Sequence, residues 1–128
     1  MSQKILIVDD DKFLLDMYAL KFSESGYEVS HANNAAEALA KVDEGFKPDV
    51  FLVDVIMPEM DGFTLVEELK KRGLTADSAV IVLSNLGQEE DVKKGLQVGA
   101  DGYIIKASAT PSEVIAKVAE IAGHKKKK

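Results

Sequence analysis

The sequence contains no cysteine among its 128 residues, and this absence excludes several kinds of chemistry. Thiol catalysis, cysteine-ligated zinc, iron–sulfur clusters and a disulfide framework all require cysteine side chains. No stretch approaches the ~20 apolar residues of a membrane-spanning helix. The N-terminal apolar run, residues 5–8, is also too short for the core of a signal peptide. We therefore expect a cytoplasmic protein with no membrane insertion.

Basic residues are outnumbered by acidic ones, 16 to 22, so the formal net charge is −6. An acidic surface repels phosphate backbones, and we therefore expect no direct binding to nucleic acid. The length fits one domain, which can bury roughly 65–70% of the surface that the unfolded chain exposes. A stable core is thus possible without disulfides or a structural metal.

Short apolar runs rich in β-branched residues alternate with stretches of helical periodicity. Lack of polar alternation predicts strands that are covered on both faces, at residues 5–8, 50–53, 79–83 and 103–105. The more polar run 28–31 predicts an edge strand. Strand and helix alternate five times, which predicts an α/β fold: a single doubly wound (βα)5 domain with a parallel sheet.

Apolar spacing and capping residues predict where the helices lie and which face they bury. Asn34 followed by Glu37, and Thr110 followed by Pro111 and Glu113, are helix-start signals. Glycines predict the helix ends at positions 26, 45, 73 and 123. The stripes expected to face the core are Phe13, Met17 and Leu20; Phe63, Val66 and Leu69; and Val114, Val118 and Ile121.

Charged and polar side chains follow the predicted strands directly. The carboxyl ends of parallel strands meet at one edge of the sheet, so these side chains are expected to lie together. The residues are Asp9, Asp10 and Asp11 after the first run, Asp54 after the third, Ser84 after the fourth and Lys106 after the fifth.

Each of these residues also has an ordinary structural interpretation. The first three aspartates could cap a helix, Ser84 could be a helix N-cap, and Lys106 could extend to water from a strand end. Asp54 is harder to explain in this way, because apolar residues flank it on both sides and a buried carboxylate needs a partner.

A divalent cation between Asp54 and the acids after the first strand would satisfy this requirement. Clustered carboxylates suit Mg²⁺, which prefers oxygen ligands and usually retains waters or a phosphate oxygen. Lys106 and Ser84 on the same edge could then bind a phosphoryl group, with Asp54 as the nucleophile that forms an acyl phosphate. The combination of these residues is specific, although each one alone is not.

The sequence closely resembles the receiver domains of two-component response regulators, of the chemotaxis-receiver type. The resemblance covers roughly residues 4–122. Its motifs are Val8-Asp9-Asp10-Asp11, the stretch from Asp54 to Gly62 (DVIMPEMDG), Ser84, and the stretch from Gly99 to Lys106 (GADGYIIK). The family has the flavodoxin-like strand order 2-1-3-4-5, an order for which the chemotaxis receiver is a standard example.

The resemblance implies a role for each matching residue. It implies that Asp54 is the phosphoacceptor, that Ser84 and Lys106 assist phosphoryl transfer, and that Ser84 and Tyr103 form the conformational switch. It implies Mg²⁺ as the cofactor. The implied metal ligands are Asp9, Asp10, Asp54 and the backbone carbonyl of Ile56.

The resemblance also implies the organisation and partners of the chain. We expect a receiver domain at residues 1–123 and a flexible basic tail at residues 124–128. The 128 residues leave no room for an output domain, so the chain is expected to be a stand-alone receiver or part of a larger regulator. The implied partners are a sensor histidine kinase or phosphotransfer protein and a downstream output protein, with a phosphorylation-dependent homodimer as an option.

Two positions depart from the family pattern: Ala107, and Asn85, which follows Ser84 where the family usually has alanine or another small residue. Ala107 follows Lys106 where the family usually has a proline in a cis bond. A cis bond before alanine costs about 3 kcal/mol, so either this loop is rearranged or the bond is strained, and the sequence favours neither. Ile56 and Leu86, beside the acceptor and the hydroxyl, are apolar and cannot orient a water molecule. They predict slow self-dephosphorylation.

Two other classes of protein fit the sequence less well than the receiver. A phosphorylation-independent pseudo-receiver would keep the fold, but the chain retains the complete set of candidate site residues. An enzyme or flavin carrier is disfavoured, because the acids after the first strand would repel a cofactor phosphate and Ile56 stands where haloacid-dehalogenase-like hydrolases have a second aspartate. A Walker-type phosphate loop is also missing. We therefore expect no enzyme beyond one that catalyses its own phosphorylation and dephosphorylation.

Overall fold

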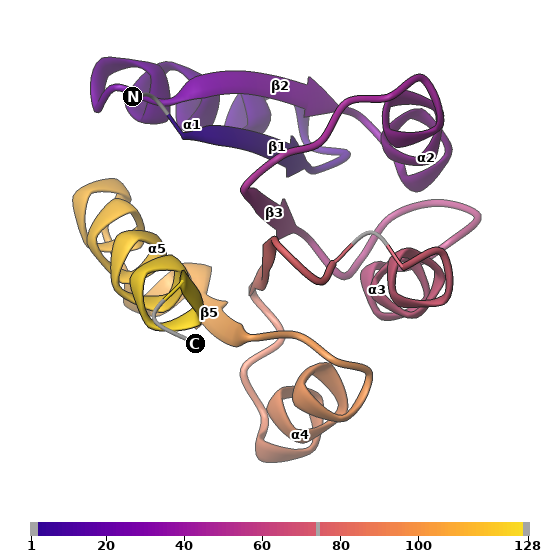
Figure 1. The fold of residues 1–128 in the computed structure, drawn as a ribbon. Helices are drawn as coiled ribbons and strands as arrows, with labels where there is room; N and C mark the ends of the chain where they lie inside the picture. The colour runs from indigo at the N-terminus through magenta and orange to yellow at the C-terminus, as the bar shows by residue number, and fades with distance from the viewer. Residues whose placement is uncertain (1–2, 74, 127–128) are drawn as a thin grey trace.

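The computed structural model describes residues 3–73 and 75–126 and contains one five-stranded parallel sheet (Figure 1). The strand order is β2-β1-β3-β4-β5, which confirms the predicted α/β topology. The polar strand β2 is at an edge and pairs with β1 alone, also as predicted. The strands are β1 (Lys4–Val8), β2 (Glu28–Ala32), β3 (Val50–Val53), β4 (Ala79–Ser84) and β5 (Gly102–Ile105).

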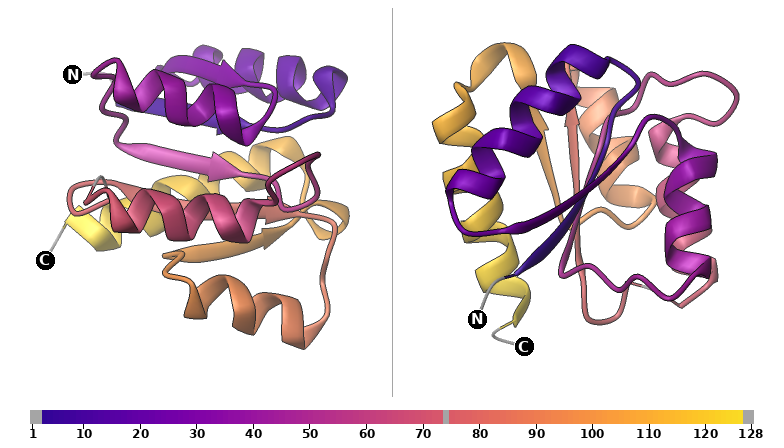
Figure 2. Two further views of the ribbon diagram at one scale, coloured as in Figure 1. Left: turned by 90° about the vertical axis from the view of Figure 1, so that its right-hand side faces the viewer. Right: turned by 90° about the horizontal axis from the view of Figure 1, so that it is seen from above.

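Four α-helices connect the strands, a fifth follows β5, and together they cover the two faces of the sheet (Figures 1 and 2). Helices α1 and α5 pack on one face, and α2 and α3 on the other, while α4 lies beside β5. None of the helices described is long and apolar enough to cross a membrane. The helices are α1 (Lys12–Glu24), α2 (Ala35–Asp43), α3 (Gly62–Lys71), α4 (Glu89–Gln97) and α5 (Pro111–Lys126), with a short 3₁₀ helix η1 (Lys106–Ser108) after β5.

The central strands are apolar throughout because helices cover both of their sides. In β1, Ile5 and Ile7 pack into the core under α1 and α5, whereas Leu6 and Val8 pack into the core under α2 and α3. All four side chains are at most 1% exposed. Successive residues of a central strand therefore enter the cores on opposite faces of the sheet, and this explains why the apolar runs in the sequence are continuous.

The predicted apolar stripe of α1 is wrong for two of its three members. Phe13 is 79% exposed and Leu20 is 59% exposed. The helix instead buries Leu15, Tyr18 and Phe22, which have the same three- and four-residue spacing. Apolar residues occupy more than one side of α1, so periodicity alone does not select the buried face.

The stripes predicted for α3 and α5 are confirmed. All three α3 residues are buried, and in α5 Val114 and Val118 are buried while Ile121 is partly buried against the same core. The predicted starts of α2 and α5 are confirmed as well. Asn34 accepts a hydrogen bond from the Glu37 amide, and Thr110 and Glu113 form a reciprocal capping box.

Three predicted helix ends are confirmed and one is wrong. Gly26, Gly45 and Gly73 follow α1, α2 and α3 with positive φ angles of 95°, 103° and 69°. Helix α5, in contrast, continues through Gly123 to Lys126. Glycine costs only about 1 kcal/mol inside a helix, so one glycine does not by itself end a helix. His124 is thus helical, while Lys127 and Lys128 lie outside the described residues, and the flexible tail stays a prediction.

At the amino edge of the sheet, acidic side chains accept hydrogen bonds from backbone amides near the starts of strands. The Lys4 amide donates to Asp49 Oδ2, and the Val80 amide donates to Asp101 Oδ2, both at 2.8 Å. The Ser78 hydroxyl donates to the Pro48 carbonyl at 2.6 Å. The first strand begins at this edge and α5 ends there, so both ends of the described chain lie on the same side of the molecule (Figure 2).

Candidate functional site

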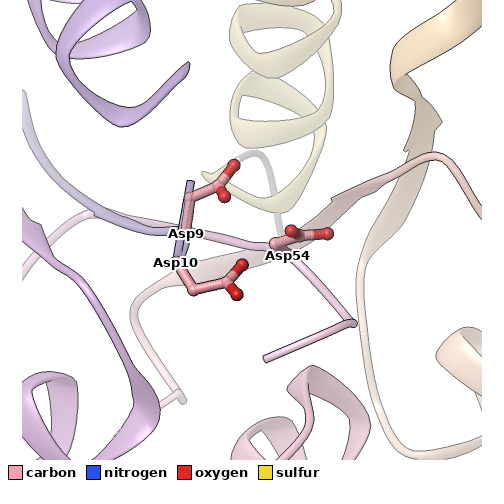
Figure 3. Close-up of side chains that lie close together, drawn as sticks. All are labelled: Asp9, Asp10 and Asp54. Atoms are coloured by element: carbon pink, nitrogen blue, oxygen red, sulfur yellow. The ribbon is translucent and has the colours of Figure 1, made fainter. Parts of the chain in front are cut away.

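The register of the sheet brings two sequence-distant aspartates together at its carboxyl edge. Val8 at the end of β1 is paired with Val53 at the end of β3. The following residues, Asp9 and Asp54, therefore emerge side by side, and the Asp54 amide still donates to the Val8 carbonyl at 2.9 Å. Figure 3 shows their side chains together with that of Asp10.

The three carboxylates form a compact cluster. Asp9, Asp10 and Asp54 each offer one oxygen atom, and these atoms lie within 4.8 Å of one another. Asp9 is buried, Asp10 is exposed, and the Asp54 side chain is 12% exposed. Backbone amides fix two of the groups: the Asp11 amide donates to Asp9, and the Val55 amide donates to Asp54.

Lys106 is the cationic side chain that the structure places at this cluster. Its Nζ lies 2.8 Å from Asp9 Oδ2 and 3.4 Å from Asp54 Oδ2, and its side chain is only 9% exposed. The alternative that Lys106 extends to water is therefore wrong. One lysine faces three carboxylates, so the site has an excess of negative charge and oxygen ligands, which suits a small hard cation.

Burial and the neighbouring charges shift two pKa values at the site. Burial raises the pKa of Asp54 to about 6; Lys106 opposes this shift, and Asp9 adds to it. Burial disfavours the charged form of Lys106, but its hydrogen bond to Asp9 and the charges of Asp54 and Asp9 outweigh that effect and raise its pKa. Above about pH 6 the acceptor candidate is therefore ionised beside a cationic lysine.

The bond between Lys106 and Ala107 is trans, as are all the peptide bonds of the described residues. Residues Lys106–Ser108 form the 3₁₀ helix η1, in which the Ala109 amide donates to the Lys106 carbonyl. Of the two options that the sequence left open, a strained cis bond is thus wrong. The other option, a rearranged loop after Lys106, therefore applies, and the lysine still contacts both carboxylates.

Ser84 ends β4 and is buried near the cluster. It is not a helix N-cap, because α4 begins at Glu89 and its N-cap is Gln88. The Ser84 hydroxyl accepts a hydrogen bond from the Leu86 amide at 3.1 Å, and the Tyr103 hydroxyl donates to the Leu86 carbonyl at 2.5 Å. Ser84 and Tyr103 are therefore linked through one loop residue.

Gly62 packs directly against the backbone at Asp54, a role that the sequence alone did not predict. A Cβ atom at position 62 would lie 2.1 Å from the carbonyl oxygen of Asp54. The Gly62 amide donates to the Val55 carbonyl at 2.8 Å. Only glycine permits this contact between the start of α3 and the acceptor backbone, and the DG pair at the end of the motif was the available signal.

Ile56 lies in the loop after Asp54, and its side chain is 61% exposed. Asp11 accepts a hydrogen bond from the Leu14 amide and caps α1, as one of the structural interpretations predicted. The structure thus brings together Asp9, Asp10, Asp54 and Lys106, places Ser84 and Tyr103 on the adjoining loop, and assigns Asp11 to the helix.

A flavodoxin-like sheet with clustered carboxylates and a lysine at its carboxyl edge defines the receiver class of signalling domains. A model of the response regulator receiver domain matches residues 5–119, and the chain belongs to this family. The phosphate regulon transcriptional regulatory protein PhoB of Pseudomonas aeruginosa is 38% identical over 117 residues, which are 91% of this chain and 50% of that protein. The chemotaxis protein CheY of Halobacterium salinarum is 34% identical, over 88% of this chain and 91% of that protein.

Solved structures agree with this assignment. A CheY-like receiver domain protein from Methanospirillum hungatei superimposes with a TM-score of 0.89 at 33% identity, covering 99% of this chain and 98% of the other. The chain spans about half the length of several of the curated regulators that it matches. It is a receiver domain of the two-component type.

Proposed function

We propose that Asp54 accepts a phosphoryl group from the phosphohistidine of a sensor kinase or phosphotransfer protein. An Asp54 carboxylate oxygen forms a bond to phosphorus while the phosphorus–nitrogen bond breaks and the imidazole leaves. The observation that carries this proposal is the position of Asp54, within 4.8 Å of two other carboxylates and 3.4 Å from Lys106 Nζ. The ionised form of Asp54 is the nucleophile in this step.

Mg²⁺ fits the donor set of this site. Asp9, Asp10 and Asp54 would hold it through carboxylate oxygens, and the backbone carbonyl of Ile56 is the fourth proposed ligand. When bound, the ion supplies positive charge to the phosphoryl oxygens. The aspartates follow the ends of the paired strands β1 and β3, and backbone amides already orient the carboxylates of Asp9 and Asp54, which supports this proposed donor set.

Lys106 and Ser84 complete the proposed phosphoryl site. The Lys106 ammonium, already between Asp9 and Asp54, supplies a cation for an acquired phosphoryl group. Ser84 supplies a hydroxyl donor from the end of β4. A phosphoryl group adds about two negative charges, and Ser84 and Tyr103 pass this change to the α4 side of the molecule through Leu86.

The first test is phosphorylation by a small donor such as acetyl phosphate. We expect intact-mass spectrometry to show a gain of one phosphoryl group in the presence of Mg²⁺ and none after chelation. Asp54→Asn should abolish the gain. The exposed Asp16→Asn variant is the matched control and should be modified like the wild type. Modification that survives in Asp54→Asn would place the acceptor elsewhere.

The second test concerns the lifetime of the product. The apolar side chains of Ile56 and Leu86 cannot orient a hydrolytic water, so we expect phospho-Asp54 to persist for minutes or longer in Mg²⁺ buffer. Replacing Ile56 by Asn or Glu should shorten the lifetime about tenfold. A wild-type lifetime of seconds would contradict the proposal.

The partners follow from the proposed transfer. We propose a sensor histidine kinase or phosphotransfer protein as donor, a downstream output protein as target and a cytoplasmic location, with a phosphorylation-dependent homodimer as one output. If a responsive control receiver gains mass and this chain does not, the pseudo-receiver interaction module becomes the better description.

A further inference from the structure

Helix α4 is held against the sheet in an unusual way. Of its nine residues, all within the described part of the chain, Gly95 is the one that is buried. Helix α3, in comparison, buries five residues, including Leu65 and Leu69. The one buried position of α4 is therefore occupied by a residue without a side chain.

The aromatic ring of Tyr103 occupies the space that a side chain at Gly95 would need. A Cβ atom at position 95 would lie 2.8 Å from Tyr103 Cδ2 and 3.1 Å from Cε2, and 3.4 Å from Phe63 Cε1. The first distance is shorter than real Cβ contacts allow. Glycine is a poor helix former, so its presence in the middle of α4 fits this packing requirement and not helix propensity.

The same ring is connected to the proposed phosphoryl site. The Tyr103 hydroxyl donates to the Leu86 carbonyl, and the Leu86 amide donates to the Ser84 hydroxyl oxygen. One end of the Tyr103 side chain thus contacts α4 at Gly95, while the other is bound to the loop that holds Ser84.

We propose that Gly95 is a positioning residue of the switch, whose missing side chain lets the Tyr103 ring lie where it holds the Ser84 loop. This inference rests on the proposed function, in which Ser84 donates to the phosphoryl group. A methyl group at position 95 makes the ring leave its position or moves α4 away. Either movement breaks the link between Tyr103 and Leu86 and leaves the Ser84 hydroxyl less ordered.

The test is binding of beryllofluoride, a phosphoryl mimic, to the full chain in Mg²⁺, measured by calorimetry and by the amide NMR signals of Ser84 and Leu86. We expect Gly95→Ala to bind at least fivefold more weakly than the wild type. Gly123→Ala is the matched control, because Gly123 is also helical and a Cβ there has no neighbour within 4 Å. Its affinity should be unchanged. Wild-type affinity in Gly95→Ala overturns the proposal.

A double variant separates action through the ring from a general effect on α4. Once Tyr103→Ala has removed the ring, adding Gly95→Ala should change the affinity less than twofold. An equal loss in both backgrounds overturns the proposal, since the effect would not pass through Tyr103. If Gly95→Ala alone does not fold, recovery of folding in the double variant supports the ring contact, and failure of both variants contradicts it.

The wild-type measurement distinguishes the two proposals. A wild type that binds no beryllofluoride in Mg²⁺ overturns the proposed function and this inference with it. A wild type that binds, together with a Gly95→Ala variant of equal affinity and unchanged Ser84 and Leu86 signals, overturns only the role of Gly95.

Discussion

The two edges of the sheet use aspartates in opposite ways. At the amino edge, Asp49 and Asp101 accept hydrogen bonds from the amides of Lys4 and Val80, so each carboxylate replaces a missing ladder partner. At the carboxyl edge, Asp54 and its two acidic neighbours crowd together, and burial raises the pKa of Asp54 to about 6. Acids at the first edge therefore satisfy backbone amides, whereas at the second edge burial disfavours the charged form of Asp54 in a candidate reactive site.

The two edges also differ in which residues have a positive φ angle. The turns after α1, α2 and α3 at the amino edge place glycine where φ is positive. At the carboxyl edge, Glu59 has a φ of 69° and is the non-glycine residue with a positive φ in the described part of the chain. Strain is thus avoided at one edge and tolerated in the loop beside Asp54.

The largest effect is expected from a substitution that disrupts the backbone packing at the carboxyl edge. Gly62→Ala forces a methyl group against the Asp54 carbonyl oxygen, at a distance of 2.1 Å before relaxation. We expect a loss of about 3 kcal/mol in the free energy of unfolding, measured by urea denaturation. A Cβ at Gly45 meets nothing within 4 Å, so Gly45→Ala, with φ at 103°, should lose only about 1 kcal/mol from backbone strain. Equal losses at both glycines would contradict the close-contact explanation.

The next effect concerns how the ionisation of Asp54 changes the stability of the fold. The folded-state pKa of Asp54, about 6, is above its ordinary value of 3.8, so the folded protein retains a proton that the unfolded chain has released. Stability should therefore fall as the pH rises from about 4 to about 6 and stay lower above that. Asp54→Asn should remove this dependence and raise the free energy of unfolding at pH 7.5 by about 1–2 kcal/mol in EDTA.

A substitution of Asp101 should change the free energy of unfolding in the opposite direction. Asp101→Ala removes the acceptor of the Val80 amide and should lower the free energy of unfolding by about 1 kcal/mol. Asp101→Asn keeps an acceptor oxygen and should lose less. If the Asp54 and Asp101 substitutions changed stability in the same direction, the contrast between the edges would be wrong.

The smallest effect concerns the loop after Asp54. Glu59→Gly removes the conformational penalty of a positive φ and should raise the free energy of unfolding by about 0.5 kcal/mol, because the added freedom of the unfolded chain offsets part of the gain. Thermal unfolding at matched pH measures the change. A clear decrease in the midpoint would show that the Glu59 side chain has a structural role of its own.

The strand order and the aspartates of the site could be predicted because their signals are local. An apolar run followed directly by Asp9 or Asp54 marks both a buried strand and its carboxyl end, and a parallel sheet brings such ends together. Lys106 was predicted in the same way. Its contact with Asp9 and Asp54 depends only on where β5 ends.

The features that sequence reasoning missed depend on packing in three dimensions. The prediction of the buried face of α1 was wrong because Phe13 and Leu15 both begin apolar stripes. Only the position of the sheet decides which stripe is buried. Gly62 and Gly95 matter for the atoms that their missing side chains would meet, which no spacing rule reveals. The trans bond after Lys106 also requires the loop itself to be known.

Both ends of the described chain lie at the edge of the sheet opposite the aspartate cluster. A fluorescent protein, affinity tag or surface tether attached at either end therefore leaves the carboxyl edge open to a phosphoryl donor. The same geometry would make the domain a convenient sensor. Two reporters joined to its ends lie at the same edge of the sheet, so a rearrangement that changes the distance between those ends can be read as a change in energy transfer between them.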